Sequence, residues 1–249
     1  MGKQSGLAAD GYMDEALNAF DKAIGDMGIG LPEAGRVLVE EWLRFFVGWE
    51  GRRVAGFENP GQLAVKLLAD SFAVGFVEGL CTGGNAVDLG SGNGWPGLAL
   101  SALGKCARVS LLDSRQGACD FLRSFIRRSG MPGVDVVQER AENAGQGREL
   151  REGFSLAVSR AMAMPGIALE LCSGLLAVGG KAVLWIGPEQ QAPRAEPGLA
   201  QTGMRLEEEI PYSLPEDMGR RVLAVYAKTE ALDSRYPRRY AAIRKKPLI

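Results

Sequence analysis

Hydrophobic residues recur at helical spacing in the first 80 residues and gather into short apolar runs after residue 85. Leu17, Phe20 and Ile24 lie three or four residues apart, which predicts an amphipathic helix near the N-terminus. A second helix is expected to begin at Pro32, because proline is favoured in the first turn of a helix. The pattern therefore predicts an N-terminal helical extension over residues 1–80.

The second predicted helix carries an aromatic stripe of Trp42, Phe45 and Phe46, with Trp49 just beyond it. Such rings can stack on nucleic-acid bases, but a stripe at helical spacing is more typical of a hydrophobic core. We therefore expect these rings to be core residues. A third helix is expected to begin at Pro60.

From residue 85 onward, short apolar strands alternate with amphipathic helices. This alternation predicts an α/β fold with a mostly parallel sheet and helices on both faces, over a domain of residues 81–230. The last two strands lie close together in sequence, which indicates an antiparallel finish. Ligands are expected beyond the carboxyl ends of the strands, next to the first one. The predicted strands span 85–89, 107–112, 134–137, 154–159, 181–186, 204–212 and 221–228.

A glycine-rich turn follows the first predicted strand, which ends in Asp88. Gly90, Gly92 and Gly94 allow the backbone to take positive φ and to come close to a ligand. Pro96 then opens a helix whose first N–H groups have no partner within the helix and can bind a polar or anionic group. The turn therefore predicts a nucleotide-like cofactor.

Two cofactors are compatible with this turn. Residues 92–97 fit the G-x-G-x-x-G pattern of NAD enzymes, and Asp113, about 20 residues later, suits ribose hydroxyls in either class. Asp88 would repel a pyrophosphate but can face a sulfonium-bearing amino acid. Ala141 and Glu142 follow the third strand, where adenine contacts fall in a methyltransferase sheet. We therefore favour S-adenosylmethionine over NAD, with an NAD-dependent oxidoreductase as the alternative enzyme.

Composition narrows the chemistry further. The chain has no histidine, which excludes histidine-based acid–base catalysis, nucleophile triads and histidine-bound metals. Its four cysteines lack metal-site spacing, so no metal is expected. No apolar run reaches the roughly 20 residues that span a bilayer, and no signal peptide is recognisable. These features predict a cytoplasmic protein that does not contact membranes.

The net charge of −1 means that any contact with nucleic acid must be local. The C-terminal tail, residues 231–249, is the strongest candidate because arginines and lysines there alternate with Tyr236 and Tyr240. A solvated tail and a contact with RNA phosphates both explain this composition.

Several motifs taken together resemble one family. They occur in the order and spacing of the bacterial small-subunit ribosomal RNA guanine-N7 methyltransferases, also called the glucose-inhibited division protein B family. The similarity covers about residues 35–249. The motifs span residues 88–97, 111–114 with 121–122, 140–142, 158–161, and 236–239 with 245–248.

This resemblance implies a class I, Rossmann-like S-adenosylmethionine-dependent methyltransferase with a mostly parallel seven-stranded sheet and an N-terminal helical extension. It implies methyl transfer to N7 of a guanine in the 530 loop of 16S rRNA. Because guanine N7 carries a lone pair and no proton, the reaction needs alignment rather than a general base. The implied partners are 16S rRNA or the small ribosomal subunit, and we expect a monomer. A methyltransferase-fold RNA-binding or assembly protein with altered or lost activity is the non-enzyme alternative.

The predicted site combines the turn analysis with the family motifs. Arg160, directly after the fourth strand, is the candidate catalytic residue, since its guanidinium could meet a phosphate or the guanine O6 edge. A salt bridge at the strand end is the alternative role for Arg160. The predicted cofactor-binding residues are Asp88, Gly90, Gly92, Gly94, Trp95, Asp113, Ser114, Ala141, Glu142 and Arg160.

The chain also departs from the family pattern at four places. Residues Arg53 to Ala55 replace an Asn-Leu-Thr segment, and Leu67 replaces a histidine. Gly117 and Ala118 stand where a Lys-Arg pair is usual, and Ile186 replaces a lysine. Several of the missing groups are expected to face RNA.

Overall fold

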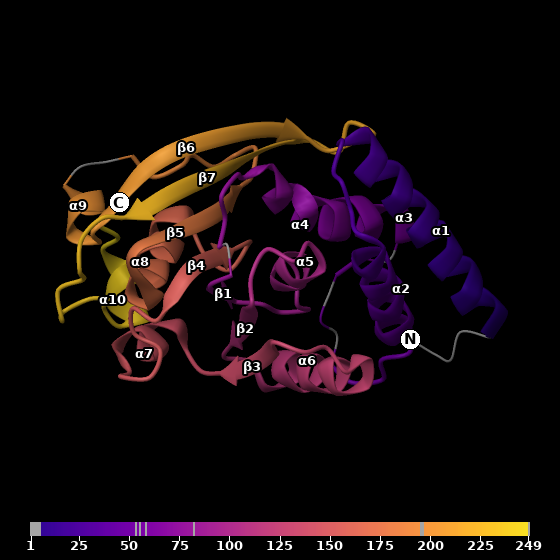
Figure 1. Cartoon of the computed structure of the whole chain (residues 1–249), viewed down its shortest axis with the longest axis horizontal. Coiled ribbons are helices and arrows are strands. Elements are labelled where there is room, and N and C mark those ends of the chain that lie inside the picture. The colour runs from indigo at the N-terminus through magenta and orange to yellow at the C-terminus, as the bar shows by residue number, and fades with distance from the viewer. Residues whose placement is uncertain are drawn as a thin grey trace.

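The protein is built around a seven-stranded sheet in the order β3-β2-β1-β4-β5-β7-β6 (Figure 1). The computed structural model describes residues 6–52, 54, 56–57, 59–81, 83–194 and 197–248, with only the backbone for residues 6–9. In chain order the strands are β1 (Asn85–Leu89), β2 (Arg108–Asp113), β3 (Val134–Gln138), β4 (Phe154–Ser159), β5 (Leu176–Ile186), β6 (Met204–Ser213) and β7 (Arg220–Lys228).

The strand pairing confirms a mostly parallel sheet with an antiparallel finish. Strands β1 to β5 pair in parallel, and β7 runs antiparallel to both β5 and β6. The start of β5 was predicted too late. The strand begins at Leu176, which pairs with Phe154 ahead of an irregularity in the β4–β5 ladder. That irregularity interrupts the alternating pattern by which the strand would be recognised.

Helices cover both faces of the sheet, as Figure 1 shows. The predicted helices after β2 and β4 are present, and the first ends at left-handed Gly130 as expected. Three short helices, α7, α9 and α10, were not predicted because four to six residues are too few to show a helical period. The helices after β1 are α5 (Gly97–Ala102), α6 (Gln116–Ser129), α7 (Ala141–Gln146), α8 (Pro165–Leu175), α9 (Gly198–Gln201) and α10 (Tyr240–Lys245).

The N-terminal extension is helical, as predicted. It contains α1 (Gly6–Asp26) and α2 (Glu33–Val47), followed by a helical rod that begins at Pro60. Asn59 caps this rod by accepting a hydrogen bond from the Gln62 N–H at 2.8 Å. The rod changes its winding along its length, through α3 (Pro60–Leu63), the π-helical turn Ala64–Ala69, α4 (Asp70–Phe72) and the 3₁₀ turn Ala73–Phe76.

The aromatic stripe of α2 lies in the core, which confirms the interpretation from its spacing. Trp42 is fully buried, and its ring stacks on Phe46 and meets Trp95 and Phe121 edge-on. The Trp42 Nε1 donates to the Asn93 carbonyl oxygen at 3.0 Å, inside the glycine turn. The extension and one face of the sheet therefore share a single hydrophobic core.

On the other face, the first half of the C-terminal tail is packed against α7 and α8. Pro237 lies between Gly145 and Gly174, where an added Cβ would come within 2.8 and 2.5 Å of the proline ring. Arg151 donates to the carbonyl oxygens of Leu232 and Tyr236 at 2.9 and 2.7 Å. The interpretation of the whole tail as solvated is therefore wrong for this part.

A buried ion pair fixes the same segment. Glu170 of α8 is completely buried, and its two carboxylate oxygens accept from the Arg238 Nε and Nη2 at 2.9 and 2.6 Å. The Arg238 backbone N–H adds a third bond to this carboxylate at 3.0 Å. Because the fork of Arg238 satisfies both oxygens, the charge of Glu170 is tolerated in the core.

We expect Arg238→Ala to lower the free energy of unfolding by about 3 kcal/mol, because Glu170 would be left buried without its counter-charge. Urea unfolding at neutral pH measures this difference. Arg239→Ala is the matched control, since Arg239 is exposed and adjacent, and it should change stability by less than about 0.5 kcal/mol. Equal effects of the two substitutions would contradict the structural role of the ion pair.

Candidate cofactor and substrate site

The glycine turn joins β1 to α5 at the carboxyl edge of the sheet. Gly90, Gly92 and Gly94 all have positive φ, at 73°, 58° and 101°, as the sequence predicted. The backbone N–H groups of Gly90 and Ser91 both donate to the Leu112 carbonyl oxygen of β2, at 2.8 and 3.1 Å. The turn is therefore tied to the neighbouring strand.

Gly90 has a second constraint besides its dihedral angle. A Cβ added at Gly90 would lie 2.6 Å from the Cγ of Met162, which belongs to the loop between β4 and α8. The same loop contains Ala161, a non-glycine residue with a φ of 55°. Met162 therefore covers the turn closely, a contact that the sequence analysis missed because no local pattern marks it.

Asp88 is the last residue but one of β1, directly before the turn, and is almost completely buried. Its Oδ2 accepts from the Gly97 N–H at 2.9 Å, at the start of α5. Its Oδ1 has no hydrogen-bond partner. In the described part of the chain, Trp95 Nε1 is the only other fully buried polar side-chain atom without one. Burial raises the pKa of Asp88 to about 7, against the opposing effects of the Gly97 N–H and the Arg160 charge.

Asp113 is the last residue of β2, and its carboxylate forms hydrogen bonds with the glycine turn. Its Oδ2 accepts from the Gly92 N–H at 2.9 Å, and its Oδ1 accepts from the Arg115 N–H at 2.8 Å. The exposed Arg115 guanidinium also folds back onto both carboxylate oxygens at 3.2 Å. Ser114, between these two residues, is exposed.

Ala141 and Glu142 form the first turn of α7, directly after β3. Glu142 is buried, and its Oε1 accepts from the Arg140 Nε at 2.8 Å. The Arg140 guanidinium lies 5.9 Å from the ring centre of Tyr240 in α10. The C-terminal tail therefore returns to the same edge of the sheet beside Glu142.

Arg160 follows β4 and is surrounded by protein partners. Its Nη1 donates to the Leu67 carbonyl oxygen at 2.9 Å and lies 3.3 Å from Asp70 Oδ2. Its Nη2 reaches the Trp95 carbonyl oxygen at 3.4 Å. The structure thus contains the salt bridge that the sequence analysis considered for Arg160, between the sheet and the helical rod.

Asp70 extends this network to β6, the strand at one edge of the sheet. Its Oδ1 accepts from the Tyr212 hydroxyl at 2.6 Å, and its backbone oxygen accepts from the Trp185 Nε1 at 2.8 Å. Burial, together with the Asp70 charge, raises the pKa of Tyr212. Sequence analysis did not join these residues, because Asp70 and Tyr212 are 142 positions apart.

The predicted residues thus meet at four neighbouring strand ends, in the sheet order β3, β2, β1 and β4. Asp113 and Asp88 lie at the ends of β2 and β1, and Glu142 and Arg160 come after β3 and β4. Three buried carboxylates and a half-buried guanidinium line one edge of the sheet. The described residues contain no cluster of three or more cysteine, aspartate or glutamate side chains arranged to hold a metal ion.

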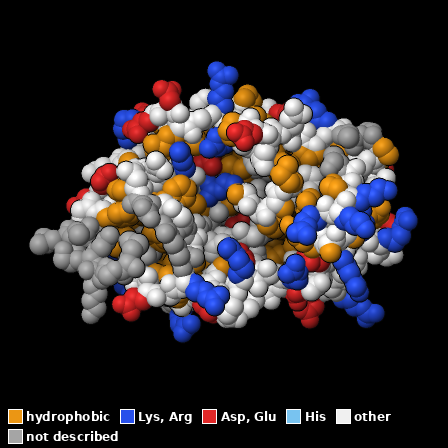
Figure 2. All heavy atoms as spheres, turned by 180° about the vertical axis from the view of Figure 1, so that it is seen from behind, with side chains coloured by type: hydrophobic (Ala, Val, Ile, Leu, Met, Phe, Trp, Pro, Cys, Tyr) orange, Lys and Arg blue, Asp and Glu red, His pale blue; other side chains and the backbone are white. Residues whose placement is uncertain are grey.

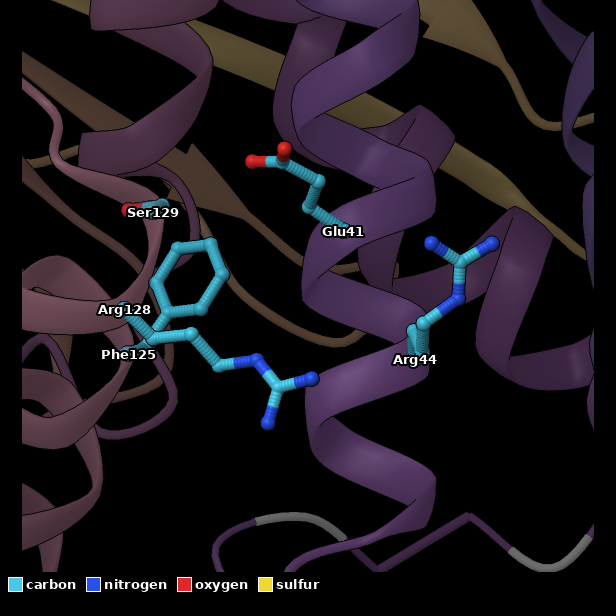
Figure 3. A pocket seen from close by; sticks show the side chains of 5 residues that line it. All are labelled: Glu41, Arg44, Phe125, Arg128 and Ser129. Carbon is cyan, nitrogen blue, oxygen red and sulfur yellow. The ribbon is translucent and has the colours of Figure 1, made fainter.

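Two cavities lie away from the glycine turn. One has a volume of about 170 Å³ and lies between α2 and α6. In Figure 3, Glu41 of α2 points toward Ser129 and Phe125, and Arg128 of α6 points toward α2. This cavity is smaller than the roughly 300 Å³ of typical ligand pockets. The other, of about 470 Å³, opens where β5 ends beside the β6–β7 hairpin.

Three of the four departures from the family pattern fall on described residues. Leu67 is buried, and its carbonyl oxygen binds Arg160, while Ile186 is buried at the end of β5. The side-chain stem of Arg52 covers Gly117, where an added Cβ would lie 3.1 Å from the Arg52 Cδ. At the fourth, Arg53 and Ala55 lie outside the described residues.

The strand order and the glycine turn define a class I methyltransferase fold. Solved structures share this fold. One is a candidate methyltransferase of Bacillus halodurans, which is 16% identical in sequence. It matches with a TM-score of 0.50 over 65% of this chain and 100% of that chain. A candidate methyltransferase of Haloferax volcanii, solved with its Trm112 activator and 14% identical, matches with a TM-score of 0.51 over 65% and 88%.

The family follows from sequence comparison. The family model described as rRNA small subunit methyltransferase G matches residues 40–216. The ribosomal RNA small subunit methyltransferase G of Carboxydothermus hydrogenoformans is 34% identical over 95% of this chain and 100% of its own length. That of Rubrobacter xylanophilus is also 34% identical, over 94% and 91%. The chain belongs to the rRNA small subunit methyltransferase G family, as its motifs indicated.

Within the described part of the chain, no helix combines the length and apolar character that a membrane span requires.

The raised pKa of Asp88 predicts a pH-dependent stability. Between about pH 4 and pH 7 the folded protein holds a proton on Asp88 that the unfolded chain releases, so this contribution to stability falls as the pH rises. Asparagine does not titrate, and its amide oxygen can still accept from the Gly97 N–H. We therefore expect Asp88→Asn to gain stability relative to wild type across this window and to level off above it.

Urea unfolding of both proteins at half-unit steps from pH 4 to pH 8 measures this difference. A difference that stays constant with pH would show that Asp88 does not titrate in this range.

Proposed function

We propose that the protein transfers a methyl group from S-adenosylmethionine to N7 of a guanine in the 530 loop of 16S rRNA. Family membership supports this proposal. The single structural observation that carries it is the line of three buried carboxylates, Asp88, Asp113 and Glu142, at adjacent strand ends around the glycine turn.

These residues fit the cofactor. Asp88 Oδ1 is a buried acceptor without a partner, which suits the ammonium group of the methionine part. The exposed Arg115 guanidinium occupies one acceptor site on each Asp113 oxygen, and ribose hydroxyls would take these two sites by displacing it. Ala141 and Glu142 would flank the adenine. When bound, the cofactor supplies an electrophilic methyl group on a sulfonium sulfur.

The chain's own residues then position the reactants and exclude water. Guanine N7 carries a lone pair and no proton, so a chain without histidine can support this reaction by alignment alone. Met162 and Trp95 provide apolar cover next to the turn. Arg160 connects the Trp95 backbone to Asp70, which supports a positioning role. Direct contact of Arg160 with substrate stays a prediction.

The partner is proposed to be 16S rRNA or the small ribosomal subunit, met by a monomer in the cytoplasm. Exposed basic side chains of α10 and its flanks support contact with RNA phosphates, since Arg239, Arg244, Lys245 and Lys246 form no ion pair with a described residue. Figure 2 shows Lys and Arg side chains gathered at the end of the molecule opposite the N-terminal helices.

Methyl transfer from labelled S-adenosylmethionine tests the activity. The substrates are 16S rRNA and small subunits that lack the modification, and N7-selective cleavage maps the product. We expect a single labelled guanine in the 530 loop. Cofactor binding without label in either substrate would favour an RNA-binding or assembly protein. Thermal stabilisation by NAD but not by S-adenosylmethionine would favour an oxidoreductase.

Asp88→Asn also tests the cofactor site. The substitution keeps an acceptor for the Gly97 N–H but removes the charge facing the cofactor's ammonium group. A hydrogen bond to a charged group contributes about 1.5–3 kcal/mol, so the Kd for S-adenosylmethionine should rise roughly 10- to 100-fold.

Isothermal titration calorimetry measures this Kd. Asp14→Asn is the matched control, since it makes the same substitution at an exposed position of α1 outside the predicted site, and its effect should be much smaller. An unchanged Kd for Asp88→Asn would remove Asp88 from the cofactor site.

A further inference from the structure

The larger cavity lies at the carboxyl end of β5 and the turn end of the β6–β7 hairpin. Its volume of about 470 Å³ falls within the roughly 300–1,000 Å³ of ligand pockets. It is distinct from the glycine turn, since none of the residues predicted to bind the cofactor lines it. The lining residues are Ile186, Gly187, Pro188, Gln190, Pro211, Tyr212, Ser213, Arg220, Arg221 and Val222.

The lining combines positive charge with apolar walls. Arg220 and Arg221 begin β7, and neither forms an ion pair with a described residue. The Arg221 Nη1 donates to the Arg220 carbonyl oxygen at 2.8 Å, which holds the two residues close together. Pro188, Tyr212 and Val222 supply apolar surface. A ligand with an anionic group and a flat apolar part matches this lining.

The cavity is joined to the methyl-transfer site by direct contacts. Tyr212, which lines it, donates to Asp70 Oδ1, and Asp70 Oδ2 lies 3.3 Å from the Arg160 guanidinium. Strands β4 and β5 are parallel neighbours, with Ser159 opposite Leu184. Both strands therefore end at the same edge of the sheet, where Arg160 and Ile186 lie. A ligand in this cavity would therefore lie beside the substrate side of the cofactor site.

We infer that this cavity binds one nucleotide of the single-stranded RNA substrate, next to the guanine that is methylated. Arg220 and Arg221 receive its phosphate, and the apolar surface of Pro188 and Tyr212 receives its base. Arginine suits phosphate because it presents several donors in a fork. Bases of single-stranded RNA are recognised by stacking on such side chains. This inference rests on the proposed function, since it assumes an RNA substrate.

The double variant Arg220→Gln, Arg221→Gln tests the inference with an RNA that contains the 530 loop. We expect the Kd for this RNA to rise about tenfold and the salt dependence of binding to lose about one unit of slope, because one phosphate contact is removed. The Kd for S-adenosylmethionine should stay unchanged, which also shows that the variant is folded.

Arg205→Gln is the matched control. Arg205 is exposed at the opposite end of the same hairpin, so this variant should bind the RNA as wild type does. A second measurement uses the RNA with 4-thiouridine beside the target guanine. Irradiation should cross-link it to the segment 211–222 in wild type, and less in the double variant.

The outcomes separate the two proposals. If wild type methylates the RNA but the double variant keeps the wild-type Kd and salt slope, the cavity is not a nucleotide site and the proposed function stands. If wild type binds S-adenosylmethionine but neither binds nor methylates this RNA, the proposed function and the inference both fail.

Discussion

The carboxylates of Asp88 and Asp113 hold the glycine turn, and the rest of the site depends on this constraint. Asp88 accepts from the Gly97 N–H and Asp113 accepts from the Gly92 N–H, so two points of the turn are fixed to the neighbouring strands β1 and β2. A turn with three positive φ values would otherwise be free to take many conformations. Hydrogen bonds to these buried acceptors are strong, because water does not compete for the donor there. The same burial leaves Asp88 Oδ1 without a partner, so one residue both shapes the turn and offers a binding atom.

The N-terminal helices also hold this turn in place, through hydrogen bonds that involve neither Asp88 nor Asp113. Trp42 of α2 donates to the Asn93 carbonyl oxygen, and Arg160 connects the Trp95 carbonyl oxygen to Leu67 of the helical rod. The extension is therefore part of the site's support, although it contributes no strand. Its helices also share the hydrophobic core with the sheet, so loosening them would release the turn. Figure 1 shows these helices on the same side of the sheet as α5 and α6.

The sequence was most informative where structure is local. Strand ranges, the glycine turn and the end of α6 at Gly130 each have a signal within a few residues, namely apolar runs, glycine spacing and a left-handed cap. The contacts of Arg160 could be predicted only as alternatives, because its partners at positions 67, 70 and 95 come from separate elements. Met162 over Gly90 and Tyr212 on Asp70 had no sequence signal at all. The sequence left the tail open between solvent and RNA, because a basic composition does not reveal the buried partner Glu170.

Because of the strand order, acidic and basic side chains lie at different places along the carboxyl edge of the sheet. Glu142, Asp113 and Asp88 lie at the carboxyl ends of β3, β2 and β1, whereas Arg220 and Arg221 begin β7 beside β5. Arg160 and Asp70 form a neutral pair between these two regions. A cofactor with ammonium and sulfonium charges is attracted to the carboxylates, and an RNA phosphate is repelled by them. Arg220 and Arg221, which form no ion pair within the described part of the chain, attract phosphate. A chain with a net charge of −1 can therefore orient a cationic and an anionic reactant, since separation along one edge matters more than the total charge.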